Sequence, residues 1–165
     1  MKHFVIAITR TCGSGGTTIA KMLANDYQID MYDRKLLRLA SEDSGINETL
    51  FAAADETTKK KPLFKAFKKV FNGELIPPES NDFTSNDNLF AYQAKVLKEL
   101  SKRESYVVVG RAADYVLKDY PYLVRVFIHA PYESCVLHEM DFQSCTRKEA
   151  VDEIARMDAY RSAYY

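Results

Sequence analysis

Hydrophobic residues occur in three short, nearly continuous runs that are typical of buried β-strands. The runs cover residues 4–8, 106–110 and 123–128, and only Arg125 interrupts the last of them. A shorter run at residues 29–32 predicts a fourth strand. β-Branched side chains dominate these runs, as they do in parallel strands that are covered on both faces. We therefore expect a parallel sheet with buried strands.

Between these runs, apolar residues recur at the spacing of amphipathic helices. Asp33 can cap the second helix, and Thr146 with Glu149 forms a capping-box pattern at the start of the last. Strands that alternate with helices favour an α/β fold in which helices flank the sheet. The helices are expected at about residues 17–26, 33–45, 89–102, 111–118, 131–140 and from 146 onward.

The periodic pattern weakens between residues 47 and 88, which we interpret as an insertion into the core. A basic run before Pro62 leads into a predicted amphipathic helix that ends before Asn72, and residues 80–88 are polar and typical of a loop. The apolar side of that helix would pack on the insertion or on a second copy of the chain. A membrane surface or a partner helix is the alternative contact.

The expected organisation is a single domain over residues 1–165. Its core covers residues 1–46 and 89–145, the insertion about 47–88, and a last helical segment about 146–165. No closing strand follows this last segment, so either the natural chain continues or the sheet lacks an edge strand. A sheet edge left open in this way makes a homodimer a candidate assembly.

Composition narrows the classes of protein to which the chain can belong. It has 165 residues, of which 47% are hydrophobic, and its 23 basic residues balance its 23 acidic ones. This balance argues against a nucleic-acid coat, and no apolar run approaches the roughly 20 residues of a membrane span. The first apolar run is too short for a signal peptide. Three cysteines without a C-x-x-C pair favour a reducing compartment, so we expect a cytoplasmic protein.

A glycine-rich turn, Gly13-Ser14-Gly15-Gly16-Thr17-Thr18, joins the first strand to the first helix. Glycines let several backbone N–H groups approach a phosphate, and the start of a helix favours negative charge. In the phosphate-loop consensus G-x-x-x-x-G-K-[ST], Gly15 matches the second glycine and Thr17 the magnesium-binding hydroxyl. Arg10 replaces the first glycine, and Gly16 replaces the lysine. The alternatives are a tight turn without a ligand, and Thr17 or Thr18 as a plain helix cap.

Further candidates follow the ends of the predicted strands, where open α/β sheets bind ligands. Arg111 comes directly after the strand at 106–110 and is a candidate phosphate ligand. Asp33 follows the strand at 29–32 and either orients a magnesium-bound water or only caps its helix. Arg34 either contacts an acceptor phosphate or is exposed. Arg156 and Arg161 lie on a charged helix, where solvated side chains are the ordinary alternative.

Two side chains near the turn raise separate hypotheses. Arg10 can fold inward and supply the positive charge that the consensus lysine would provide, for which Lys21 is less well placed. Cys12 lies within the turn, where a helix N-terminus lowers the pKa of a thiol and makes it oxidisable.

Several blocks of the chain resemble the cytidylate kinase-like family of the P-loop nucleoside-monophosphate kinase superfamily. The resemblance extends from residue 4 to residue 165 and leaves only the insertion poorly matched. The blocks are Ile8-Thr9-Arg10, Gly13-Ser14-Gly15-Gly16, Tyr32-Asp33-Arg34-Lys35-Leu36-Leu37, Val107-Val108-Val109-Gly110-Arg111-Ala112-Ala113-Asp114-Tyr115-Val116-Leu117 and Ile154-Ala155-Arg156-Met157-Asp158-Ala159-Tyr160-Arg161.

The resemblance implies a P-loop NTPase fold with a helical acceptor-binding insertion and an arginine-bearing lid at about 146–165. It also implies transfer of the γ-phosphoryl group of ATP, with Mg²⁺, to a pyrimidine nucleoside monophosphate. In that family the turn Gly13 to Thr18 would hold the donor phosphates, with Thr17 at the metal. Arg111 would grip the phosphate of the acceptor, and Arg156 and Arg161 would be the lid arginines near the transferring group. Beside these family roles, we expect Asp33, Arg34 and Asp114 at the acceptor and Arg10 among the catalytic cations.

The chain departs from authentic cytidylate kinases at two positions. Gly16 replaces their phosphate-loop lysine, and Ala112 replaces their aspartate after the Gly-Arg pair, with Asp114 two positions later. The first departure favours an alternative function, a catalytically weak nucleotide sensor or regulatory protein on the same fold. The second leaves open a kinase for a different small acceptor. The expected partners are therefore small nucleotides, and neither nucleic acid nor a membrane is expected.

Overall fold

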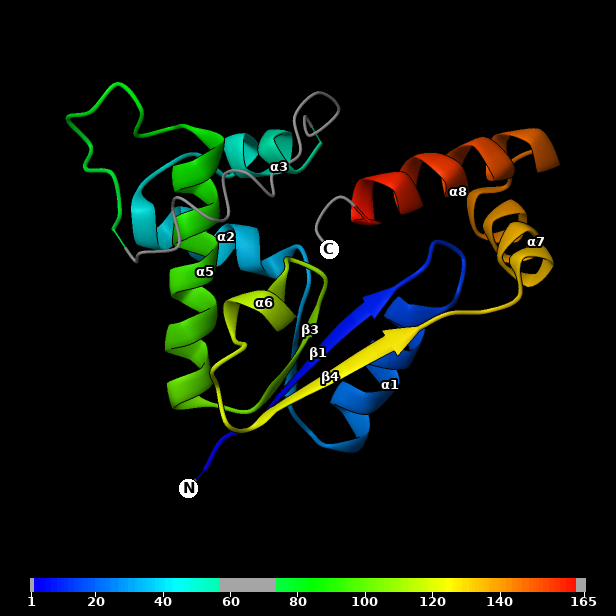
Figure 1. Ribbon diagram of the computed structural model, residues 1–165, viewed down its shortest axis with the longest axis horizontal. Coiled ribbons are helices and arrows are strands. Elements are labelled where there is room, and N and C mark those ends of the chain that lie inside the picture. The colour runs from blue at the N-terminus through cyan, green and yellow to red at the C-terminus, as the bar shows by residue number, and fades with distance from the viewer. Residues whose placement is uncertain (1, 57–73, 163–165) are drawn as a thin grey trace.

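The computed structural model describes residues 2–56 and 74–162, and within them four strands form one parallel sheet (Figure 1). The order across the sheet is β2-β3-β1-β4, and every neighbouring pair is parallel. This confirms the predicted parallel sheet. The strands are β1 (Val5–Arg10), β2 (Asp30–Tyr32), β3 (Tyr106–Val109) and β4 (Leu123–Ile128).

Helices follow each strand, so that the whole is an α/β fold. Their ends carry the expected signals: Gly45 is left-handed at the end of α2, and Ser85 accepts from the Asn88 N–H at the start of α5. The capping box before α8 is confirmed, because the Glu149 carboxylate accepts from the Thr146 N–H at 2.8 Å. The helices are α1 (Gly16–Asp26), α2 (Lys35–Ser44), α3 (Glu48–Glu56), α5 (Asn86–Arg103), α6 (Ala113–Val116), α7 (Tyr132–Gln143) and α8 (Arg147–Ser162).

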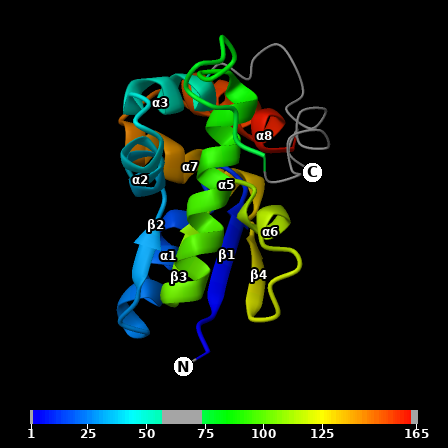
Figure 2. The ribbon, with the colours of Figure 1, turned by 90° about the vertical axis from the view of Figure 1, so that its left-hand side faces the viewer.

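The two faces of the sheet carry separate cores because alternate side chains of a strand point to opposite faces. Val5 and Val108 face a core shared with α2, α3, α5 and α6. Ile6 and Val107 face a second core, in which the small residues Ala20 and Ala24 of α1 let that helix lie close to the sheet. Figure 2 shows α5 in front of the sheet and α1 behind it.

The weakly patterned region contains a helix that the sequence analysis did not locate. The Phe51 side chain of α3 is fully buried in the core with α2 and α5. Asn88, also buried, binds the backbone of Ile76 and Phe83 and so fastens the segment before α5 to that helix. The amphipathic helix predicted after Pro62 lies outside the described residues.

β4 is a strand as predicted, but the expectation that it is buried is wrong. It lies at an edge of the sheet, where Val124 is 50% and Phe127 61% exposed. Only its side chains Val126 and Ile128 pack against the core around α1. The apolar run could not reveal this, because hydrophobicity does not say which strand ends a sheet. Among the described helices, none has the length and apolarity that crossing a membrane requires.

Candidate functional site

The loop between β1 and α1 has a shape that suits an anion. Gly13 (φ 73°) and Gly15 (φ 77°) are left-handed, and the Ser14 hydroxyl donates to the Thr11 carbonyl at 2.8 Å. Gly15 is the N-cap of α1, and no described side chain caps its first turn. The alternative that Thr17 or Thr18 is the cap is therefore wrong. Because the first N–H groups of a helix have no partners within it, this end of α1 retains donors for a ligand.

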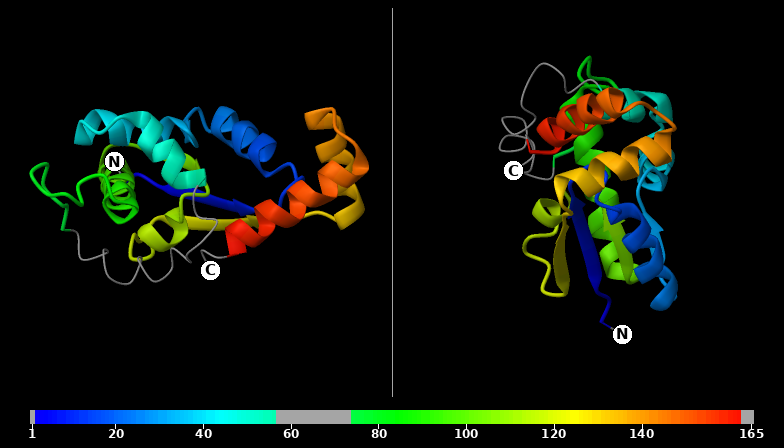
Figure 3. Two further views of the ribbon diagram at one scale, coloured as in Figure 1. Left: turned by 90° about the horizontal axis from the view of Figure 1, so that it is seen from above. Right: turned by 90° about the vertical axis from the view of Figure 1, so that its right-hand side faces the viewer.

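A cavity of about 300 Å³ lies over this loop. Segments far apart in the sequence enclose it, since α7 and α8 follow β4 and cross the carboxyl end of the sheet above the loop (Figure 3). Every residue of the predicted phosphate-binding turn, Gly13 to Thr18, lines the cavity. The other lining residues are Arg10, Thr11, Cys12, Lys21, His138, Glu139, Phe142, Gln143, Glu153, Met157 and Arg161.

The surroundings of Gly16 explain why no lysine stands there. A Cβ atom at Gly16 would lie 2.6 Å from Cβ and 2.8 Å from Cγ of Arg10, far closer than atoms pack. A Cβ atom at Gly110 would lie 2.9 Å from Nη1 of the same arginine. The Arg10 side chain therefore crosses over Gly16 toward the end of β3. In the consensus sequence a glycine opens the loop and a lysine follows the second glycine, whereas here an arginine stands at the first of these positions and a glycine at the second.

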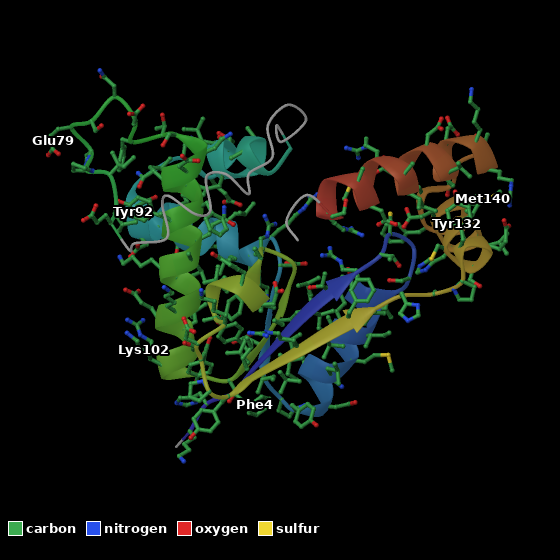
Figure 4. All side chains as sticks on the ribbon, in the orientation of Figure 1. Phe4, Glu79, Tyr92, Lys102, Tyr132 and Met140 are labelled. Atoms are coloured by element: carbon green, nitrogen blue, oxygen red, sulfur yellow. The ribbon has the colours of Figure 1, made fainter. Side chains whose placement is uncertain are left out.

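Apolar contacts hold the loop against α7 and α8. Cys12 is buried in a cluster with Val136 of α7 and Ile154 of α8. A Cβ atom at Gly13 would lie 2.8 Å from the Cα of Cys135, so only glycine lets the loop backbone touch that of α7. Met140 packs against the same cluster, on the α7 side where the two helices meet (Figure 4).

Polar contacts reinforce this arrangement. The Asp158 carboxylate of α8 accepts from the Cys12 N–H at 2.7 Å, and Arg161 donates to the Arg10 carbonyl at 3.4 Å. Nδ1 of His138 lies 2.9 Å from the Gly13 carbonyl oxygen. Both helices thus contact the backbone of the loop, and one of them brings a carboxylate to it.

Of the two arginines predicted for the last helix, only Arg161 lines the cavity within the described residues. It also lies 3.8 Å from Asp158. Arg156 forms an ion pair with Glu153 at 2.6 Å, and its side chain is 55% exposed. The partner Glu153 lines the cavity, so Arg156 lies one side chain away from it.

The prediction of a reactive, low-pKa thiol at Cys12 is wrong. Cys12 is 6% exposed, and its pKa is raised from 9.0 to about 12, chiefly by burial. The nearby Glu139 carboxylate contributes to this rise, and Arg161 only partly offsets it. Cys12 lies before the start of α1 and packs with α7 and α8, where burial and a carboxylate outweigh the helix dipole.

The predicted acceptor-binding residues lie at the same edge of the sheet but outside this cavity, among the residues that the structure describes. Asp33 and Arg34 follow β2, and Arg111 and Asp114 follow its neighbour β3. Asp33 Oδ1 accepts from the Lys35 N–H at 3.4 Å, but Asp33 is not the N-cap of α2: that position is Arg34, whose side chain makes no capping hydrogen bond.

The turn after β3 has an uncommon backbone. Gly110 (φ 71°), Arg111 (φ 62°) and Ala112 (φ 47°) are all left-handed, although the last two are not glycines. Such conformations are found preferentially where the surrounding structure or a ligand site requires them. Among the four acceptor candidates, Arg111 is the residue whose own backbone has such a conformation.

Several cavity residues were not singled out from the sequence. On α7, His138 and Phe142 are four residues apart, as are Glu139 and Gln143. On α8, Met157 and Glu153 lie four and eight residues before the predicted Arg161 and share one helix face with it. The spacing could have grouped them, but it could not show that these faces meet the loop after β1.

The site can also be tested for fit to a nucleotide and a divalent cation. Among the described residues, Thr11 Oγ1 is the buried side-chain atom without a hydrogen-bond partner, and it belongs to the loop. No cluster of three His, Cys, Asp or Glu side chains that could hold a metal occurs in the described part of the chain. Mg²⁺ bound to a nucleotide needs few protein ligands, because phosphates and water supply the rest, so the Thr17 hydroxyl suits it.

Comparisons with known proteins agree with this geometry. The chain is similar, at 24% identity, to the crystal structure of an uncharacterized protein from Eubacterium ventriosum ATCC 27560, with a TM-score of 0.65 over 98% of this chain and 75% of the other. This likeness shows the fold. No curated protein sequence matches the chain. A sequence model of the cytidylate kinase-like family matches residues 5–165, and the chain therefore belongs to the cytidylate kinase-like family.

Proposed function

We propose that the protein is a nucleoside-monophosphate kinase that transfers the γ-phosphoryl group of ATP to a pyrimidine nucleoside monophosphate such as CMP or dCMP. The observation that carries this proposal is the uncapped start of α1, which opens with the Gly13–Thr18 loop on a cavity that Arg10 and Arg161 also line. Phosphoryl transfer depends mainly on positioning and on neutralising charge, and the loop and the two arginines would serve these two ends.

The donor phosphates would lie on the backbone N–H groups between Gly13 and Thr18. Gly13 and Gly15 allow the left-handed turn that orients these groups, and the dipole of α1 favours the negative charge. Thr17 would hold the metal through its hydroxyl. When bound, Mg²⁺ neutralises charge on the β- and γ-phosphates.

Arg10 would provide the charge that a phosphate-loop lysine provides elsewhere. Its side chain starts at the loop and extends toward Gly110, which precedes Arg111. The guanidinium thus lies between the donor loop and the candidate acceptor site. A planar guanidinium can bind phosphate oxygens with two hydrogen bonds at once, so it can bridge the two substrates.

The acceptor would bind at the ends of β2 and β3. Arg111 would hold its phosphate, and Asp33, Arg34 and Asp114 would complete the site. In the reaction, an acceptor phosphate oxygen forms a bond to the γ-phosphorus of ATP while the bond from that phosphorus to the β,γ-bridging oxygen breaks, and ADP leaves.

The helix α8 would act as the lid. Arg161 already lines the cavity and would stabilise charge on the transferring group. Arg156 would join it only after exchanging its ion pair with Glu153 for the substrate. Closure would also exclude water, which otherwise competes as the acceptor.

A coupled assay with ATP, Mg²⁺ and each of CMP, dCMP, UMP, AMP and GMP tests this proposal, with calorimetric titration of ATP alongside. We expect turnover with CMP or dCMP, and Arg161→Ala should reduce it about 100-fold. Arg147→Ala is the matched control, because Arg147 of the same helix pairs with Glu133 and is not among the described residues that line the cavity. Turnover only with a purine monophosphate would refute the pyrimidine assignment.

A nucleotide sensor of weak catalytic power is the second candidate function. Gly16 favours it, as does the Asp158 carboxylate that already occupies the Cys12 N–H. ATP binding without turnover on any of the five monophosphates would support the sensor, or a kinase for another small acceptor. Absence of ATP binding would refute all three functions.

A further inference from the structure

Phe142 of α7 is an exposed apolar side chain in the lining of the cavity. It lines the cavity above the candidate phosphate loop, yet it is 77% exposed. It lies in the last turn of α7, just before the left-handed Ser144 that ends the helix. A large apolar ring that faces both solvent and a phosphate-binding cavity is suited to a flat ligand that is attached to phosphates.

Two contacts link the Phe142 ring to the loop. Phe142 contacts the His138 ring edge to face, with 6.3 Å between the ring centres and 86° between the planes. Nδ1 of His138 in turn lies 2.9 Å from the Gly13 carbonyl oxygen. One side chain, His138, thus lies between Phe142 and the phosphate loop. In a nucleoside triphosphate, a sugar and one phosphate lie between the base and the β- and γ-phosphates. A nucleotide with its phosphates on the loop can therefore bring its base toward Phe142.

We propose that Phe142 is the stacking platform for the base of the donor nucleotide. This inference rests on the proposed function, because it takes the donor phosphates to lie on the Gly13–Thr18 loop. Bases stack on aromatic side chains with a gain that is nearly independent of the base, since every base has a π-face. The exposed ring becomes covered when the donor binds, and Phe142 thereby distinguishes a nucleoside triphosphate from triphosphate alone.

A neighbouring side chain shows that exposure alone does not carry this argument. Leu137 of α7 is 61% exposed, but it is not among the described residues that line the cavity. It therefore provides a matched control for truncating an exposed apolar side chain of the same helix.

The test is calorimetric titration of ATP and of inorganic tripolyphosphate into the wild-type chain and three variants. Phe142→Ala should weaken ATP binding about 10- to 100-fold, the value of stacking one base, and leave tripolyphosphate binding unchanged within about twofold. Phe142→Tyr keeps the ring and should bind ATP like the wild type. Leu137→Ala should change neither affinity.

The inference is overturned if Phe142→Ala binds ATP as tightly as the wild type, or loses ATP and tripolyphosphate equally. In both cases the wild-type chain still binds ATP, so the proposed function stands. If the wild-type chain binds neither ligand, the proposed function fails and this inference fails with it. Because Phe142 is exposed, its variants should keep the wild-type melting temperature, and a thermal scan checks this.

Discussion

The loops that follow β1 and β3 end neighbouring parallel strands, yet they turn by different means. After β1, the left-handed positions are glycines, Gly13 and Gly15. After β3, Gly110 is followed by two left-handed residues with side chains, Arg111 and Ala112. Holding a residue other than glycine in this region costs about 1–3 kcal/mol, so the second loop is strained where the first is not.

This difference follows from what each loop contributes. The loop after β1 offers its backbone, both to α7, which touches Gly13, and to the cavity. A Cβ atom at Gly13 would meet the backbone of α7, and one at Gly16 would meet the Arg10 side chain. In the loop after β3, Arg111 offers a side chain, which a glycine could not supply. The contrast agrees with the proposal that one loop holds the donor phosphates by N–H groups and the other holds the acceptor phosphate by a guanidinium.

The largest predicted effect concerns the burial of Cys12 in the loop after β1. Since its pKa is raised to about 12, Cys12 is almost entirely a neutral thiol at pH 8 and reacts poorly with iodoacetamide. We expect its alkylation to be at least about 100-fold slower than that of Cys145, which is partly exposed. Peptide mass spectrometry over time measures both rates. Equal rates of alkylation would show that α7 and α8 do not bury Cys12.

The next effect concerns the contact between the loop and α7. Gly13→Ala should lower the free energy of unfolding by about 3 kcal/mol, because the new methyl group meets the backbone of Cys135 and the backbone is left-handed. Gly45→Ala is the matched control. Gly45 has the same φ of 73° but open space around its Cβ position among the described residues, so we expect a loss of about 1 kcal/mol. Denaturant titration measures both, and equal losses would contradict the contact.

The loop after β3 should affect the acceptor alone. Arg111→Ala should raise the KM for the monophosphate about 10- to 100-fold, because a charge-assisted contact to phosphate is lost, and leave the affinity for ATP unchanged. Arg125→Ala, an exposed arginine on the edge strand, serves as the control. Equal losses of donor and acceptor binding would contradict the division between the two loops.

The smallest predicted effect concerns the backbone strain at Ala112 in the loop after β3. Ala112→Gly relieves a left-handed alanine and should change the free energy of unfolding by no more than about 1 kcal/mol, in the stabilising direction. Ala113 is the next buried alanine and belongs to α6, so Ala113→Gly should lower the free energy of unfolding by about 1 kcal/mol. Denaturant titration compares the two variants. A similar destabilisation in both would mean that position 112 stores no strain.

Much of the fold could be predicted from the sequence, because strands buried on both faces and amphipathic helices have distinct periods. The runs at β1 and β3 and the Thr146–Glu149 capping box are local signals that the structure confirms. The exposure of β4 could not be predicted, because it depends on the order of strands in the sheet. The helix α3 was not located, because its core contact through Phe51 depends on distant α5.

The candidate site was predictable only where it is continuous in the sequence. The turn Gly13 to Thr18 was identified as a unit and lines the cavity. Asp158, His138 and Phe142 were not identified, because only the packing of α7 and α8 across the sheet brings them to the loop. The direction of the Cys12 pKa shift was predicted wrongly for the same reason, since the thiol is buried against α7 and α8 and Glu139 of α7 lies near it.

The central claim is that Arg10 and Gly16 exchange the glycine and lysine positions of the usual phosphate loop, so that Arg10 is the cation of the donor site. The most direct measurement is the turnover number of three variants, Arg10→Gly, Gly16→Lys and the double variant that restores the consensus. We predict that Arg10→Gly loses about 100- to 1,000-fold, as when one charge-stabilising donor is removed. Gly16→Lys should also lose activity, because its Cβ meets the Arg10 side chain.

The double variant Arg10→Gly/Gly16→Lys should recover at least tenfold over Arg10→Gly, because the glycine at position 10 makes room for the lysine. A Gly16→Lys variant more active than the wild type, or a double variant no better than Arg10→Gly, would contradict the exchange.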